Sequence, residues 1–161
     1  RGHANQYYQF PEDCIDVIYY GVDHAMFNPQ KVTPYREEVR QELGIPAEAP
    51  AIIYVSHNWK RKGLRTLLLA LAKASHFPHP PHVVIIGRGK PKPYRKLCQE
   101  NNILDRVHFI GTTEHVERFY GASDLLVLPT QYDPFANVCL EAMACGLPVI
   151  TTSSNGAAAI I

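Results

Sequence analysis

The sequence predicts an α/β domain, a doubly wound parallel sheet with helices on both faces. Short apolar runs alternate with helical segments from residue 51 onward, which is typical of a parallel sheet covered on both sides. Polar loops follow the runs, at 56–62, 87–92, 111–113 and 129–137. Ligands of such sheets bind outside the C-terminal ends of the strands, so these loops are expected to share one edge. The 161 residues, 46% of them hydrophobic, can bury a sizeable core.

The first third of the chain is less regular. Residues 1–14 have no clear periodicity and are interpreted as a linker or the tail of something upstream. Ile15–Tyr20 (IDVIYY) predicts a strand and Gly21–Asp23 a turn. A short helix is expected over Tyr35–Leu43, because Gly44 follows it as a C-cap.

The strand–helix alternation then becomes regular. Predicted strands cover Ala51–Val55, Val83–Ile86, Val107–Ile110, Asp124–Leu128 and Leu147–Thr151. Predicted helices cover Gly63–Ser75, Pro93–Asn101, Glu114–Gly121 and Asn137–Cys145, and another begins over Gly156–Ile161. The chain opens in a linker and stops as a helix starts. We therefore interpret residues 15–161 as one domain of a larger enzyme, truncated at its C-terminus.

Charge is unevenly distributed along the chain. Residues 1–48 hold four Lys/Arg and eight Asp/Glu, residues 49–99 hold ten Lys/Arg and no carboxylate, and residues 100–161 hold two and seven. The acid-free third generates a positive field, so an anionic ligand is expected there, together with peripheral contact to an anionic membrane surface. Aromatic residues are not interleaved with the basic ones, which argues against a nucleic-acid partner.

Cysteine and histidine spacing predicts neither disulfides nor a metal site. The four cysteines have no C-x-x-C spacing and are interpreted as reduced thiols of a cytoplasmic protein. The eight histidines form no H-x-x-x-H pair and no mixed Cys/His cluster, so no bound metal is expected. No apolar run approaches the length of a membrane span, and the first ten residues lack the apolar core of a signal peptide.

The most informative stretch is Tyr132–Ile150, YDPFANVCLEAMACGLPVI. Asp133 and Glu141 stand eight residues apart, one on each side of a predicted strand-to-helix turn. The start of that helix would present free backbone N–H groups to an anion, namely those of Phe135, Ala136, Asn137 and Val138. Donors for phosphate beside carboxylate acceptors for hydroxyls indicate a sugar-nucleotide site. The plainer alternative is a turn aspartate and an exposed helical glutamate.

Two glycine-containing loops lie in the basic third. In Lys60-Arg61-Lys62-Gly63, cations and backbone donors beside the glycine would meet a diphosphate, whereas the alternative is a solvated basic loop. Gly87-Arg88-Gly89 lacks the third glycine of a dinucleotide fingerprint, which makes a Rossmann redox enzyme a distant alternative.

Four segments resemble, in order and spacing, the nucleotide-sugar domain of retaining GT-B glycosyltransferases of family 4. They are YVSHNWKRKGLRTLLLALA, VVIIGRGKPKPYRKL, RVHFIGTTEHVERFYGASDLLVLPT and YDPFANVCLEAMACGLPVITT. The likeness is nearest to the lipopolysaccharide core glucosyltransferase I group and covers Ile15 to Ile161. Such enzymes have two domains, and this one would bind the nucleotide sugar.

The resemblance also implies roles for individual residues. Arg61 and Lys62 match the diphosphate-binding basic pair, and Glu141 matches the acid that holds the ribose. Asp133 occupies the position of the family's first acid, usually Glu and one methylene longer, which contacts the donor sugar. Phe109, Gly111 and Thr112 match the strand end and loop beside the nucleobase, and Gly21 matches a glycine near the interdomain cleft.

The function implied is metal-independent, cofactor-free and retaining transfer of a hexose, glucose from UDP-glucose. The acceptor would be a lipopolysaccharide core or related glycolipid, bound by an N-terminal domain that this chain lacks. A monomeric, cytoplasmic protein, peripheral at the inner membrane, is expected, and this chain alone should be inactive. Two alternatives stay open: a nucleotide-binding module without catalysis, and a GT-B enzyme with a sucrose, glycogen or cell-wall acceptor.

Overall fold

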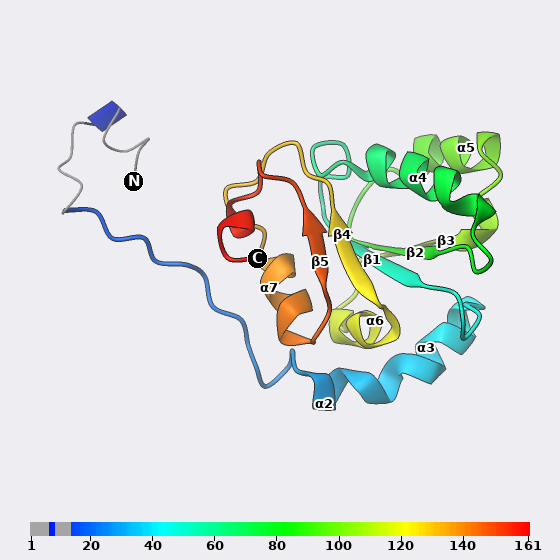
Figure 1. The fold of residues 1–161 in the computed structure, drawn as a ribbon, viewed down its shortest axis with the longest axis horizontal. Coiled ribbons are helices and arrows are strands. Elements are labelled where there is room, and N and C mark those ends of the chain that lie inside the picture. Colours follow the sequence, from blue (N-terminus) through cyan, green and yellow to red (C-terminus); the bar gives the residue numbers. More distant parts are fainter. Residues whose placement is uncertain (1–6, 9–13) are drawn as a thin grey trace.

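The computed structural model describes residues 7–8 and 14–161, and at its centre is a five-stranded parallel sheet (Figure 1). The strands are β1 (Ala51–Val55), β2 (His82–Ile86), β3 (Val107–Gly111), β4 (Leu125–Leu128) and β5 (Val149–Thr151). Their order across the sheet is β3-β2-β1-β4-β5, and every pairing is parallel. The chain thus winds outward from β1 to β3 and returns to the other side of β1. The expected doubly wound sheet is confirmed, with its switch point between β1 and β4.

Helices cover both faces of this sheet. They are α2 (Pro29–Val32), α3 (Arg36–Leu43), α4 (Leu64–Lys73), α5 (Pro91–Glu100), α6 (Val116–Ala122) and α7 (Asn137–Ala144). Figure 1 shows α4 and α5 over one face, and α6 with α3 packed against it on the other. None of the helices that the structure describes is long and apolar enough to cross a membrane.

The core forms because the strands are apolar on both sides. All five residues of β2 are buried, and α4 adds a buried stripe made of Leu64, Leu67, Leu68 and Leu71. On the opposite face a buried arginine ties three segments together. Arg40 donates to the carbonyl oxygens of Pro46 (2.7 Å) and Ala122 (3.1 Å) and to Asp124 Oδ2 (3.3 Å). Asp124 in turn accepts the N–H of Ala51 at 2.7 Å, which fixes the start of β1.

The two ends of the chain differ from prediction. The strand expected over Ile15–Tyr20 is wrong: this segment has no strand pairing, and Ile18 is 90% exposed. A segment forms a strand only where a neighbouring strand pairs with its backbone N–H and C=O groups. The composition of the segment does not show whether such a neighbour is present. The helix expected to begin over Gly156–Ile161 is a single 3-10 turn, Gly156–Ala159. The predicted linker over residues 1–14 lies mostly outside the described residues.

Candidate functional site

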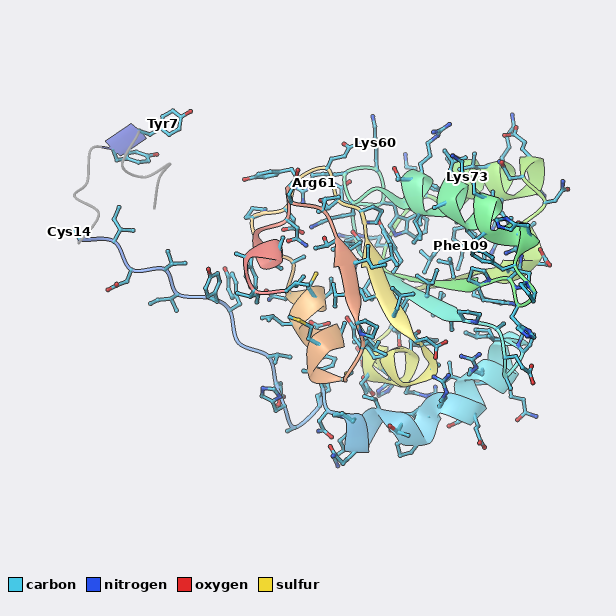
Figure 2. All side chains as sticks on the ribbon, viewed as in Figure 1. Tyr7, Cys14, Lys60, Arg61, Lys73 and Phe109 are labelled. Atoms are coloured by element: carbon cyan, nitrogen blue, oxygen red, sulfur yellow. The ribbon has the colours of Figure 1, made fainter. Side chains whose placement is uncertain are left out.

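A cavity of about 330 Å³ lies at the C-terminal ends of β1 and β4, against the first turn of α7. The structure brings seven of the predicted site residues into its lining: Arg61, Lys62, Asp133, Phe135, Ala136, Asn137 and Val138. Figure 2 shows Arg61 on the loop between β1 and α4, at this edge of the sheet. Polar loops that are far apart in the sequence therefore meet at one site, as the strand order requires.

The start of α7 offers two free donors rather than four. The N–H of Phe135 donates to Asp133 Oδ1 (3.1 Å), and that of Ala136 donates to Asn155 Oδ1 (3.2 Å). The N–H groups of Asn137 and Val138 have no hydrogen-bond partner within the described part of the chain, and no side chain caps the helix. These two donors, at the positive end of the helix dipole, face the cavity and suit an anion.

The basic loop supplies cations, but the backbone N–H groups of Arg61, Lys62 and Gly63 are already engaged, unlike the expectation for Gly63. The N–H of Arg61 donates to Asn58 Oδ1 (3.2 Å), that of Lys62 to the Asn58 carbonyl (2.9 Å), and that of Gly63 to the Lys60 carbonyl (3.2 Å). Gly63 has φ +76°, and a Cβ there would lie 1.9 Å from the Pro129 carbonyl oxygen. The glycine therefore permits close approach of the β4–α7 loop rather than of a ligand.

Asp133 is buried and already paired. Its carboxylate forms an ion pair with Lys62 Nζ, and only 8% of its side chain is exposed. Burial, followed by the charge of Arg61, lowers the pKa of Lys62. Asp133 thus anchors both the basic loop and the turn before α7. A sugar contact would be an addition to these two interactions.

Asn155 is an organising residue that the sequence analysis missed. It is 2% exposed and accepts the N–H groups of Ala136 (3.2 Å) and Ala157 (3.1 Å) through the same oxygen. The next residue, Gly156, leaves no room for a side chain, because a Cβ there would lie 1.8 Å from the Pro134 carbonyl oxygen. The Asn-Gly pair at 155–156 is a turn signal, but nothing local indicates that it holds the start of a helix eighteen or more residues earlier.

Glu141 lies beyond the cavity, one turn along α7 from Val138. It accepts a hydrogen bond from the Tyr120 hydroxyl at 2.8 Å through Oε2. Burial raises the pKa of Glu141, and the Tyr120 hydrogen bond acts in the opposite direction. Burial and the nearby Glu141 charge raise the pKa of Tyr120 well above its usual range. The hydroxyl therefore stays protonated and orients the carboxylate.

A second cavity, of about 350 Å³, adjoins the loops after β2 and β3. Phe109, Gly111 and Thr112, the residues matched to the nucleobase region, all line it. The Arg95 guanidinium lies 4.8 Å from the centre of the Phe109 ring, which forms one wall.

A hydrogen bond connects Arg88, which lines the second cavity, to His57, which lines the first. His57 Nδ1 accepts the N–H of Arg88 at 3.0 Å, so the loops after β1 and β2 are held together and the neutral ring carries its proton on Nε2. Gly21 is placed elsewhere: it is exposed and lines neither cavity. Among the described residues, no three His, Cys, Asp or Glu side chains are grouped so as to hold a metal ion.

Sequence comparison identifies relatives of this chain. The model of a family described as "Glycosyl transferases group 1" matches residues 35–161. The chain is 31% identical over 154 residues to an uncharacterised glycosyltransferase of Methanocaldococcus jannaschii, covering 94% of this chain and 39% of the relative. It is 27% identical over 152 residues to the lipopolysaccharide glucosyltransferase WaaG of Escherichia coli, covering 94% and 41%.

Solved structures agree with these relatives. A crystal structure of WaaG superposes with a TM-score of 0.85 at 28% identity, covering 98% of this chain and 43% of that one. The Anabaena protein HepE, solved in complex with UDP-glucose, gives a TM-score of 0.80 at 26% identity, covering 91% and 40%. The chain thus spans about two fifths of the length of these proteins. The resemblance inferred from sequence is confirmed.

Proposed function

Because the chain belongs to the glycosyl transferases group 1 family, we propose that it is the donor-binding part of a retaining hexosyltransferase. The donor is UDP-glucose and the acceptor is a lipopolysaccharide core or related glycolipid, held by a part of the protein outside this chain. The donor assignment is supported by the UDP-glucose complex of HepE, and the acceptor class by the printed function of WaaG. The reaction takes place in the cytoplasm, at the membrane where such acceptors are anchored.

One observation carries this proposal: two cations and two free backbone donors converge on one cavity. Arg61 and Lys62 enter it from the β1–α4 loop, and the N–H groups of Asn137 and Val138 enter from α7. Breaking the bond between sugar and phosphate leaves negative charge on the diphosphate. Fixed donors and cations aimed at that charge stabilise it without a metal ion or other cofactor.

The nucleoside would extend from the diphosphate toward the second cavity. Glu141, oriented by Tyr120, accepts hydrogen bonds from the ribose hydroxyls, and the base lies beside Phe109, Gly111 and Thr112. Asp133 lies between the diphosphate lysine and the helix start, where its carboxylate would contact the donor sugar once Lys62 turns to the diphosphate. Gly21 remains a prediction about the interface with the acceptor-binding part.

Calorimetric titration of this chain with UDP, ADP and GDP tests the donor site. We expect UDP to bind in preference and with the same affinity with or without Mg²⁺. Lys62→Met should weaken UDP binding about tenfold or more, because it removes a charge-assisted contact. Lys60→Met is the matched control: it lies two residues away but lines an outer groove, and it should change the affinity less than twofold. Equal losses in both variants would contradict the proposed site.

Transfer itself is tested on the full-length protein. Incubation with UDP-glucose and a truncated lipopolysaccharide core should yield a product whose new glycosidic bond keeps the anomeric configuration of the donor, measured by NMR. UDP binding without turnover on any acceptor would favour a nucleotide-binding module. Turnover only with a sucrose, glycogen or cell-wall acceptor would contradict the proposed acceptor class but not the proposed donor site.

A further inference from the structure

The outer face of α4 and α5 is covered by lysine and arginine. Nine of the ten cations between residues 49 and 99 are exposed, and this stretch holds no carboxylate. We define the cationic face by six exposed members on or beside these two helices: Lys60, Arg65, Lys73, Lys90, Lys92 and Lys96. Figure 2 marks two of them, one before the first turn of α4 and one at its end, so the face runs the length of that helix.

A groove of about 630 Å³ runs between the two helices and is itself basic. Lys60, Arg65 and Lys96 line it, and Glu100 is the single carboxylate among the described residues that line it. Glu100 lies 3.8 Å from Lys96 Nζ and offsets one of the three charges. The groove therefore attracts anions and is large enough to admit a phosphate group with part of what carries it.

The chemistry of this face distinguishes between classes of partner. No exposed large apolar side chain lies on α4 or α5, both of which the structure describes in full, whereas the centre of a protein interface is rich in aromatic residues and poor in lysine. Tyr94, the one aromatic residue lining the groove, packs edge-on against Trp59 with ring centres 5.5 Å apart. No row of exposed rings is present on this face to stack nucleic-acid bases.

We propose that the α4–α5 face docks on a bilayer surface through anionic lipid headgroups. Dispersed lysines on a broad face match a fluid sheet of negative charge, which needs no fixed complementary shape. Lys60 lines the groove while its neighbours Arg61 and Lys62 line the donor cavity, so docking brings the cavity mouth close to the membrane. Docking needs no catalysis; only its use in reaching a glycolipid acceptor rests on the proposed function.

Vesicle sedimentation tests the docking. The chain should bind phosphatidylglycerol–phosphatidylcholine vesicles at low salt, release at high salt, and not bind pure phosphatidylcholine. Arg65→Glu changes the local charge by two and should weaken binding about 25-fold, taking about fivefold per charge. The matched control is Lys31→Glu on α2, on the opposite side of the sheet in Figure 1. With both variants compared at physiological ionic strength, screening over a Debye length of about 8 Å should keep its effect below twofold. Circular dichroism checks that both variants fold.

Adding UDP to saturation tests whether vesicles bind to the cationic face or to the donor cavity. Vesicle affinity should stay unchanged in UDP, because Arg61 and Lys62 belong to the cavity, and it should persist even if UDP does not bind. The proposal is overturned if UDP abolishes vesicle binding, if Lys31→Glu and Arg65→Glu weaken it equally, or if anionic vesicles do not bind at all. Tighter binding of a single-stranded oligonucleotide than of anionic vesicles would also overturn it, in favour of nucleic acid.

Discussion

Breaking the ion pair between Asp133 and Lys62 should lower the stability of the protein but strengthen its binding of UDP. Asp133→Asn removes the carboxylate charge but keeps an oxygen that can accept the Phe135 N–H. The Lys62 side chain is only 13% exposed, so its charge would be left buried without a partner. Removing one member of such a pair costs about 3 kcal/mol, and the free energy of unfolding should fall by about that much.

Binding of UDP should instead become tighter. In the unliganded protein the diphosphate must compete with the Asp133 carboxylate for Lys62. Two unit charges about 4 Å apart near a protein surface interact by about 4 kcal/mol. If a third of that is returned to the ligand, about 1.4 kcal/mol, UDP affinity rises about tenfold in Asp133→Asn. The variant is therefore expected to be less stable and yet a better nucleotide binder.

Urea denaturation and calorimetry with both UDP and UDP-glucose measure the two effects. UDP-glucose should gain less than UDP if Asp133 also contacts the donor sugar. Asp133→Glu, which keeps the carboxylate charge on a side chain one methylene longer, is the control and should bind UDP much as the natural chain does. Weaker UDP binding by Asp133→Asn at unchanged stability would refute the argument that the carboxylate competes for Lys62.

Three further substitutions test individual contacts. Tyr120→Phe removes the hydrogen bond to Glu141 and should lower the free energy of unfolding by about 1 kcal/mol. In calorimetry the variant should bind UDP more weakly but pyrophosphate equally well, because Glu141 is expected to bind the ribose. Burial, followed by a stacked neighbouring histidine, lowers the pKa of His82 from 6.5 to about 4. Neutral His82 therefore contributes stability above pH 6.5, and about 3 kcal/mol should be lost as the pH falls to 4; His82→Gln should flatten this limb in urea titrations across pH. Burial alone would raise the pKa of Asp124, but a backbone N–H and two arginines, Arg40 among them, lower it below its usual value. Asp124→Asn should thus lower the free energy of unfolding by about 2 kcal/mol at pH 7, measured by denaturation. Below the lowered pKa the effect should be small, because the natural side chain is then protonated and uncharged like asparagine.

The fold could be predicted because its strands are buried on both faces. Short, continuous apolar runs such as Ala51–Val55 and Val83–Ile86 are typical of strands that are buried on both faces. The helices between successive runs indicate that the strands are parallel, because parallel strands need a crossover connection. Ile15–Tyr20 is also rich in β-branched and aromatic residues, with Asp16 its one charged residue, and forms no strand. What differs is whether a second strand lies beside it, which the local sequence does not encode.

The candidate site was predictable in position but not in its internal bonding. Arg61, Lys62 and the start of α7 follow strands, and the strand order brings them to one edge. Which donors stay free depends on contacts across the sequence, such as Asn155 with Ala136. The turn signal of Asn155-Gly156 does not reveal the bond of Asn155 to Ala136, and no local signal reveals that of Tyr120 to Glu141, because each of these partners is about twenty positions away.

These contacts determine what a ligand meets first. Both predicted acids are already engaged, Asp133 through both oxygens by Lys62 and the Phe135 N–H, and Glu141 through Oε2 by Tyr120, so Asp133 is not an open acceptor in the unliganded protein. The N–H groups of Asn137 and Val138 and the guanidinium of Arg61 have no such partner within the described chain and are the natural first contacts for a diphosphate. Under the proposed function, Lys62 reaches the diphosphate only by leaving Asp133. The Asp133 carboxylate is then free to contact the donor sugar only when a diphosphate is bound. Pairing with Lys62 offsets the one carboxylate that the described residues contribute to the cavity lining before an anionic ligand binds, and under the proposed function it couples the position of Asp133 to the presence of donor.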